Sequence, residues 1–281
     1  MINELKSDIL HEVIQKRPAQ TNKTNFGRVL LIGGNEQYGG AILMAAAATV
    51  NAGAGLVTVA THPDNIAPLH VRTPEAMAFD WNNEPLLAEQ IKKSSVILLG
   101  PGMGTDKFAI GLVKWVLHKT HAKQTVIVDA SALTIMADEH IPFPHTAFTI
   151  ATPHQGEWAH LSSVMVNYQS SMDLNDLQRQ NLNIDVLVLK KHHTVVLSQN
   201  RQVELHLGGP FQATGGMGDV LAGIIAGFVA QFAEPRRATE AAVYAHSDIA
   251  QELAMHNWVV KPTFVADFLP NYMVRIQNNL V

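Results

Sequence analysis

Ala213-Thr214-Gly215-Gly216-Met217-Gly218-Asp219, followed directly by the apolar run 220–232, is the stretch of this chain that decides its fold. Three glycines in four residues leave the backbone uncovered, so consecutive N–H groups can approach an anion closely. The apolar residues after Asp219 have the spacing of a buried helix face, which predicts a helix over 220–232. Because the N-terminus of a helix attracts negative charge, the junction predicts an anion-binding loop at the start of a buried helix.

Asp219 places a carboxylate at this positively polarised helix end, where a phosphate would also bind. Two interpretations fit the spacing. Asp219 either acts on a group that is being phosphorylated, or it is the N-cap of the helix, a position that Asp fills well. The spacing alone leaves both open.

The composition indicates a packed globular protein and excludes several classes of function. The chain has 281 residues, 47% of them hydrophobic and 16% charged, and a formal net charge of −4 without any run of Lys or Arg, so we expect no nucleic-acid partner. The absence of cysteine excludes disulfides, thiolate metal sites and cysteine nucleophiles. The first residues lack an apolar signal core, and the apolar stretches 41–52 and 220–232 are shorter than the roughly 20 residues of a membrane span. We therefore expect a cytoplasmic protein without membrane contact.

Aliphatic runs alternate with helical segments along the chain. The runs are continuous, so both faces of the sheet that they form should be covered. The expected strands are 27–34, 56–61, 95–100, 125–129, 147–151 and 185–190, with a hairpin formed by 194–198 and 202–206 around 199–201. The expected helices are 41–52, 107–119, 156–164, 173–182 and 220–232. This rhythm predicts a three-layer α/β fold, with a central, mainly parallel sheet flanked by helices, and a single domain over residues 1–281.

Four of the expected strands end in glycine-rich or charged segments, namely 33–41, 100–104, 152–157 and 190–194. Ligands bind where parallel strands end and helices begin, so these segments and the 213–219 loop should share one edge of the sheet. A Walker-type P-loop is absent, because no glycine precedes Lys-Ser or Lys-Thr at the required spacing. Gly53-Ala54-Gly55 precedes a strand rather than a helix, which excludes a Rossmann fingerprint. Phosphate recognition should therefore use a different geometry.

Taken together, these segments resemble the ribokinase-like superfamily. The stretch 213–223 is similar to its anion-hole and catalytic-Asp signature. Within the superfamily, the chain resembles the ADP-dependent NAD(P)H-hydrate dehydratases. This likeness rests on further motifs in family order: Tyr38-Gly39-Gly40-Ala41, the segment 52–59, Gly100-Pro101-Gly102-Met103-Gly104, Val128-Asp129-Ala130 and Thr152-Pro153-His154-Gln155-Gly156-Glu157.

The resemblance implies repair of hydrated nicotinamide cofactors by a carbon–oxygen hydro-lyase. ADP would phosphorylate the hydroxyl of (S)-NAD(P)H-hydrate, and loss of phosphate would restore NAD(P)H, with AMP as the other product. Asp219 would be the general base. The amides of Gly215, Gly216, Met217 and Gly218 would form the anion hole.

The resemblance also implies ligand-binding residues. The hydrated dinucleotide would contact Ala41, Gly104, His154 and Asp219. The adenine nucleotide would contact Lys190, Lys191, His192, His193, Thr194 and Gly218. Glu157 would organise Mg²⁺ through water.

Simpler roles remain open for some of these residues. His154 follows a proline and fits a loop position, Glu157 fits the first turn of a helix, and Lys190 fits a strand end that reaches solvent. We expect a structural role for Asp129, which lies at a strand end and can cap or orient a neighbouring loop.

One segment departs from the family pattern. The family usually has a Lys-Gly-Ala-Gly-Thr-like segment where this chain has Lys190-Lys191-His192-His193-Thr194, so bulky side chains replace glycines, and both ADP and ATP stay open as donors. Adjacent strand residues point to opposite faces, and we expect no carboxylate partner nearby. We therefore expect His192 and His193 to have a surface role rather than to bind a metal.

Family members often carry a fused epimerase domain, so the resemblance implies a separate epimerase as functional partner and a homo-oligomer, with a tetramer favoured. The Ala- and Gly-rich segments 41–52 and 222–230 permit close packing in the core or at a subunit interface. Two alternatives are a ribokinase-like kinase of the hydroxyethylthiazole or hydroxymethylpyrimidine type and a non-catalytic nucleotide-binding protein. Such kinases usually carry Asn where His154 stands, and a protein that only binds has no need of a base at Asp219.

Overall fold

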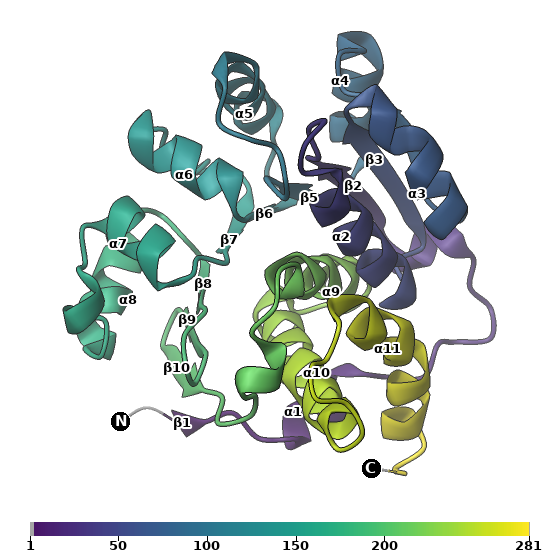
Figure 1. Ribbon diagram of the computed structural model, residues 1–281, viewed down its shortest axis with the longest axis vertical. Helices are drawn as coiled ribbons and strands as arrows, with labels where there is room; N and C mark the ends of the chain where they lie inside the picture. The colour runs from purple at the N-terminus through teal and green to yellow at the C-terminus, as the bar shows by residue number, and fades with distance from the viewer. Residues whose placement is uncertain (1–2, 281) are drawn as a thin grey trace.

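The computed structural model describes residues 3–280 and shows one twisted sheet between two layers of helices (Figure 1). The strands are β1 (Asn3–Glu4), β2 (Arg28–Ile32), β3 (Leu56–Thr61), β4 (Met77–Asp80), β5 (Val96–Leu99), β6 (Thr125–Val128), β7 (Phe148–Ala151), β8 (Val186–Leu189), β9 (Val195–Ser198) and β10 (Arg201–Glu204). The helices are α1 (Asp8–Val13), α2 (Gly39–Asn51), α3 (Ile66–Arg72), α4 (Glu84–Lys93), α5 (Lys107–Lys119), α6 (Ser131–Asp138), α7 (Gln155–Ser162), α8 (Met172–Asn181), α9 (Met217–Gln231), α10 (Pro235–Ala254) and α11 (Pro262–Gln277).

The strand order is β1-β10-β9-β8-β7-β6-β5-β2-β3-β4. The strands from β8 through β7, β6, β5, β2 and β3 to β4 are parallel, while β9 is antiparallel to both of its neighbours. The expected mainly parallel sheet is therefore confirmed. Parallel strands need crossover helices, which explains why helices cover both faces.

Alternate residues of each strand pack into two separate cores. Along β2, Val29 and Leu31 face the core shared with α1, α2, α9, α10 and α11, whereas Leu30 and Ile32 face the core shared with α4, α5, α6 and α7. Figure 1 shows the two groups of helices on opposite sides of the sheet. This arrangement explains why the strands read as continuous aliphatic runs rather than alternating ones.

Helices α2 and α9 pack against each other over the middle of the sheet. A side chain at Gly223 would collide with the backbone oxygen of Ala45, and one at Gly227 would collide with Ala52. Thr49 Oγ1 donates a hydrogen bond to Gly223 O across the same contact (3.0 Å). The small residues predicted to allow close packing therefore serve the core between these two helices.

Most sequence-derived elements are confirmed with small shifts at their ends, but α9 begins at Met217, three residues earlier than expected. The hairpin is confirmed with different bounds, since Arg201 belongs to β10 and the turn is formed by Gln199 and Asn200. Among residues 3–280, no helix combines the length and apolarity that crossing a bilayer requires.

Candidate active site

The four unusual strand ends lie at one edge of the sheet. They follow β2, β5, β7 and β8, which all run in the same direction. Hydrogen bonds tie neighbouring ends together, from Gly34 N to Pro101 O (2.8 Å) and from Lys190 N to Pro153 O (2.8 Å). The prediction of a common edge is thus confirmed, and α9 begins at this edge.

The loop before α9 turns into the helix at a glycine in a left-handed conformation. Gly216 is the N-cap of α9 with φ 96°, a left-handed conformation that favours glycine, and a side chain there would collide with Met44. The first backbone bond of the helix runs from Val220 N to Gly216 O (3.0 Å). Within residues 3–280, the amides of Met217 and Gly218 have no backbone acceptor, as expected for the first turn of a helix. These N–H groups are available to an anion.

Asp219 lies in the first turn of α9 but does not cap it. The N-cap is Gly216, and no side chain caps this helix, so the cap interpretation is wrong. Burial, together with the neighbouring carboxylates Asp129 and Glu157, raises the pKa of Asp219 to about 7, against the opposing effect of the Lys190 ammonium. A carboxylate with this pKa exchanges protons near neutral pH, as a general base requires.

Lys190 points into the protein rather than toward solvent. Its Nζ lies 2.9 Å from Oδ1 of Asp129, a carboxylate that is 1% exposed and that also accepts a hydrogen bond from Thr152 Oγ1 (2.7 Å). Burial opposes the charged form of Lys190, but the carboxylates of Asp129, Glu157 and Asp219 outweigh it and raise the pKa of Lys190 above its usual value. The solvent-facing interpretation of Lys190 is therefore wrong, and a permanent cation stands beside Asp219.

The Lys190 ammonium also faces the loop before α9. A Cβ added to Gly218 would lie 3.3 Å from Lys190 Nζ, so the ammonium lies close to this part of the loop. The cation and the free amides of the helix start are therefore directed at the same volume. An anionic ligand placed there would meet both.

His154 and Glu157 form a capping box at the start of α7. His154 Nδ1 accepts hydrogen bonds from the amides of Gly156 (3.0 Å) and Glu157 (3.1 Å), and Glu157 Oε2 accepts from His154 N (2.8 Å). His154 is therefore a helix cap rather than a plain loop residue. Its side chain is 61% exposed, so its ring remains available to a ligand while Nδ1 holds the helix. Glu157 does occupy the first helical turn, as the simpler interpretation expected.

A cavity of about 520 Å³ lies between β8 and the starts of α7 and α9. It brings together many of the residues predicted to bind nucleotide or substrate, namely His154, Lys190, Lys191, His192, His193, Thr194 and Gly218, and one residue of the predicted anion hole, Met217. His246 of α10 also lines it, and among the described residues no partner satisfies its buried Nε2. Burial lowers the pKa of His246 to about 4, so the imidazole is neutral. The sequence analysis did not single out His246, because nothing near it in the chain suggests a ligand.

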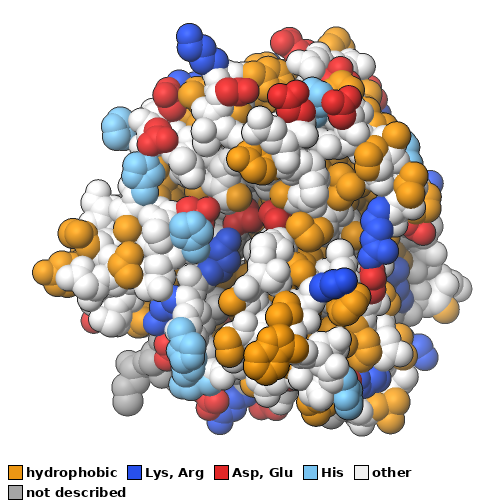
Figure 2. All heavy atoms as spheres, in the orientation of Figure 1, with side chains coloured by type: hydrophobic (Ala, Val, Ile, Leu, Met, Phe, Trp, Pro, Cys, Tyr) orange, Lys and Arg blue, Asp and Glu red, His pale blue; other side chains and the backbone are white. Residues whose placement is uncertain are grey.

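Ala41 and Gly104 lie at the same edge but do not line this cavity. A Cβ on Gly102 would lie 2.9 Å from the Cβ of Ala41, and Asn35 N donates a hydrogen bond to Gly102 O (2.7 Å). Gly104 has φ 80° and donates its N–H to Ser131 Oγ (3.1 Å). These two residues form a separate group beside β2 and β5. On the face drawn in Figure 2, acidic side chains lie in a central hollow beside basic and histidine side chains.

The segment after β8 differs from the expected strand. Residues 191–193 form a bend, and His193 has φ 63°, so the rule that adjacent strand residues point to opposite faces does not apply. The rings of His192 and His193 stack with centroids 4.2 Å apart. The expectation that no carboxylate lies nearby is also wrong, because the β9–β10 hairpin brings Glu204 and His206 to His193.

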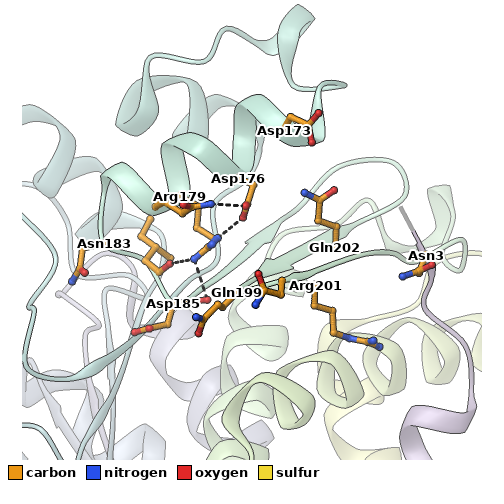
Figure 3. Close-up of a pocket in the computed structure, with 12 residues that line it drawn as sticks. Asn3, Asp173, Asp176, Arg179, Asn183, Asp185, Gln199, Arg201 and Gln202 are labelled. Atoms are coloured by element: carbon orange, nitrogen blue, oxygen red, sulfur yellow. Dashed lines mark hydrogen bonds and ion pairs between the residues drawn. The ribbon is translucent and has the colours of Figure 1, made fainter. Parts of the chain in front are cut away.

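A larger polar hollow of about 730 Å³ lies between α8 and the β9–β10 turn (Figure 3). It adjoins the start of β8, whereas Lys190 follows its end, so it lies at the opposite edge of the sheet. Arg179 Nε pairs with Asp176 (2.7 Å) and its Nη1 donates to Ile184 O (2.5 Å), as the dashed lines of Figure 3 show. Arg201 pairs with Glu240 outside the hollow (2.6 Å). Asp176 and Glu240 thus neutralise the two arginines of this hollow, and we do not assign the candidate site to it.

Comparison with known proteins agrees with this geometry. The sequence model of the NAD(P)H-hydrate dehydratase family matches residues 29–271. An ADP-dependent (S)-NAD(P)H-hydrate dehydratase of Lactiplantibacillus plantarum is 45% identical over 272 residues, which cover 96% of each chain. A ribokinase-like superfamily protein from Enterococcus faecalis V583 is 43% identical, with a TM-score of 0.95 over 98% of this chain and 97% of that one.

A more distant structure shows the same fold. The ADP/ATP-dependent NAD(P)H-hydrate dehydratase of Bacillus subtilis, co-crystallised with ATP/Mg²⁺, is 24% identical, with a TM-score of 0.86 over 98% of this chain and 99% of that one. The architecture is that of the ribokinase-like superfamily. The chain belongs to the NAD(P)H-hydrate dehydratase family, and it is an enzyme of the hydro-lyase class.

Proposed function

We propose that this enzyme uses ADP to dehydrate the S epimer of NAD(P)H-hydrate and restores NAD(P)H with release of AMP and phosphate. The observation that carries the proposal is the position of Asp219, a carboxylate with a pKa of about 7 beside the Lys190 cation and the free amides of the α9 start. The L. plantarum relative is named an ADP-dependent (S)-NAD(P)H-hydrate dehydratase, which supports the proposed substrate and the dependence on ADP.

The proposed reaction begins with proton transfer to Asp219. As the hydroxyl of the hydrate loses its proton to the carboxylate, its oxygen attacks the β-phosphorus of ADP, and the bond between that phosphorus and the AMP oxygen breaks. The C–O bond to the phosphate ester then breaks and phosphate leaves with that electron pair, while the neighbouring carbon gives a proton to phosphate or water and its C–H electron pair re-forms the double bond. Phosphorylation is required because hydroxide is a poor leaving group and phosphate a good one.

The transferred phosphoryl group would lie against the α9 start. The amides of Gly215, Gly216, Met217 and Gly218 are proposed to stabilise the charge on its oxygens, with the helix end behind them. Lys190 adds a full positive charge at the same place, since its Nζ lies close to Gly218. The electrostatic contribution is large because the groups are fixed before the reaction starts.

The adenine nucleotide is proposed to occupy the 520 Å³ cavity. Lys190, Lys191, His192, His193 and Thr194 line one side of it, and Gly218 lies at the end nearest Asp219. The buried, unpartnered Nε2 of His246 supports a polar ligand in this cavity, because a buried nitrogen without a partner is costly. With side chains in place of the family's glycines, both ADP and ATP are to be tested as donors.

We propose that Mg²⁺ binds near the carboxylates of this edge. Asp129, Glu157 and Asp219 carry the oxygen atoms that Mg²⁺ prefers, and each raises the pKa of Lys190, but within residues 3–280 these three carboxylates do not form a compact set of direct ligands, so water has to complete the coordination. Glu157 uses Oε2 to cap α7, while Oε1 makes only a long contact of 3.5 Å to His154 Nε2 and can hold an ion through water. When bound, Mg²⁺ would neutralise charge on the phosphate oxygens.

The hydrated dinucleotide is proposed to bind along Ala41, Gly104 and His154. The exposed ring of His154 lies at the start of α7, whereas Ala41 lies at the start of α2 and Gly104 in the loop after β5, at the same edge of the sheet. This His favours the dehydratase over the kinase alternative, in which Asn usually stands at the position. Since only the S epimer would be consumed, we also propose functional pairing with a separate NAD(P)H-hydrate epimerase.

The proposal is tested by adding the purified enzyme to hydrated NADH or NADPH with Mg²⁺ and either ADP or ATP. Recovery of the near-ultraviolet absorbance of NAD(P)H, with one AMP formed per NAD(P)H when ADP is the donor, is the expected result. Absence of recovery with both nucleotides would overturn the dehydratase assignment.

A further inference from the structure

Within residues 3–280, three metal-ligating side chains come together beside the nucleotide cavity. The ligand atoms of His193, Glu204 and His206 all lie within 4.8 Å of one another. We propose that these residues form a binding site for a transition-metal dication of the zinc type. None of the three has a role in the proton transfer assigned to Asp219.

The hairpin register explains why residues that are distant in sequence meet here. Leu205 N donates a hydrogen bond to Thr194 O (2.8 Å), which aligns the segment after β10 with the segment before β9. Leu205 is 1% exposed and points into the core. Because side chains alternate along an extended strand, Glu204 and His206 both point away from that core and toward His193.

The three side chains are already oriented toward one another. His206 Nε2 lies 3.3 Å from Glu204 Oε2, and the rings of His193 and His206 have centroids 4.5 Å apart. Lys191 Nζ lies 3.3 Å from the other oxygen of Glu204, Oε1, so it holds the carboxylate and leaves Oε2 for an ion. The stacked ring of His192 restricts the rotation of His193.

The types of the three ligand side chains indicate which metals the site would bind. Two imidazoles and one carboxylate are a known zinc set, which leaves a fourth position for water or a ligand. Imidazole nitrogen favours zinc, copper, nickel or cobalt over Mg²⁺ or Ca²⁺, which prefer oxygen. The proposed site is therefore distinct from the carboxylates of Asp129, Glu157 and Asp219, which lie around Lys190.

A metal at this site would fix one wall of the nucleotide cavity. His193 belongs to the segment 190–194 that lines the cavity, whereas Glu204 and His206 belong to the hairpin. An ion held by all three would tie this segment to the sheet. The metal site itself does not depend on the proposed dehydratase activity.

Calorimetric titration of the tag-free enzyme with Zn²⁺ tests the proposal, and Co²⁺ serves as a spectroscopic probe of the ligand set. We expect one Zn²⁺ per chain, unaffected by excess Mg²⁺, with affinity reduced at least about tenfold in His193→Ala and in His206→Ala. The matched control is His160→Ala: His160 Nε2 lies 2.6 Å from Asp138, but within residues 3–280 this pair has no third ligand, so Zn²⁺ affinity should not change.

The thermal midpoint of unfolding distinguishes loss of the metal site from damage to the fold. Zn²⁺ should raise the thermal midpoint of the wild type and of His160→Ala, but not that of the two site variants. Unchanged Zn²⁺ affinity in both site variants, or an equal loss in His160→Ala, would overturn the proposal. Because the titration uses neither hydrate nor ADP, its outcome is separate from that of the dehydratase assay.

Discussion

The Nζ of Lys190 lies 2.9 Å from Oδ1 of the buried Asp129, so a residue after β8 neutralises a residue after β6. The pair leaves the Lys190 cation beside Asp219, where it opposes the rise in the pKa of Asp219 that burial causes. Burial, two further carboxylates and one cation therefore set the pKa of Asp219, and the protonation state of Asp219 should govern the rate of the enzyme.

The first prediction concerns pH. Asp219 must be ionised to accept a proton, and its pKa is raised to about 7, so kcat/KM should fall as the pH drops below about 7. Well below the pKa, kcat/KM should fall about tenfold for each unit by which the pH decreases. A pH–rate profile of the wild type measures this, and a rate that stays constant down to pH 5 would contradict the assignment of Asp219 as base.

Replacing Lys190 with Met should move that profile. The ammonium stabilises the ionised form of Asp219, so Lys190→Met should shift the acidic limb to higher pH and weaken nucleotide binding. Lys191→Met is the matched control for the pH shift alone, because Lys191 also lines the nucleotide cavity but pairs with Glu204 rather than with the Asp219 group. An identical shift in both variants would mean that Lys190 has no specific effect on Asp219.

Asp219→Asn should stabilise the folded protein at alkaline pH. The folded pKa of Asp219, about 7, lies above the ordinary value of 3.8, so the folded state binds the proton more tightly and loses stability as the pH rises between these values. The neutral amide removes this penalty and should raise the free energy of unfolding at pH 8 by roughly 1–4 kcal/mol, with little gain near pH 4. Urea unfolding at both pH values measures the difference. An equal change at both would show that the buried charge is not the cause.

His154→Asn separates helix capping from substrate binding. Asn is a good N-cap and can replace the His154 Nδ1 that accepts from Gly156 and Glu157, so the thermal midpoint should stay near that of the wild type. Loss of the exposed ring should raise KM for the hydrated dinucleotide by about tenfold. An unchanged KM would mean that His154 serves only to cap α7.

Local sequence predicts much of the fold, but it does not predict the contact of Lys190 with Asp129 or its effect on the pKa of Asp219. Runs such as 125–129 and 185–190 predicted strands because both faces are buried, whereas the half-exposed β4 has no such run and went unpredicted. The start of α9 was placed too late because Met217 and Gly218 were assigned to the loop.

The candidate site was likewise predicted only in part from the sequence. Glycine-rich strand ends predicted its edge, since parallel strands bring their ends together. The Asp129–Lys190 pair joins residues 61 positions apart, and only the strand order brings them into contact. The conformation of His193 and its approach to Glu204 depend on the hairpin register, which residue types alone do not specify.

The most direct test of the central claim is the rate of NADH recovery from hydrated NADH, with ADP and Mg²⁺, by the wild type and by Asp219→Asn. We expect full recovery by the wild type and a loss of at least about 100-fold in the rate of the variant, with nucleotide affinity largely retained. A fully active Asp219→Asn enzyme would contradict it, because Asp219 would then take no proton in the reaction.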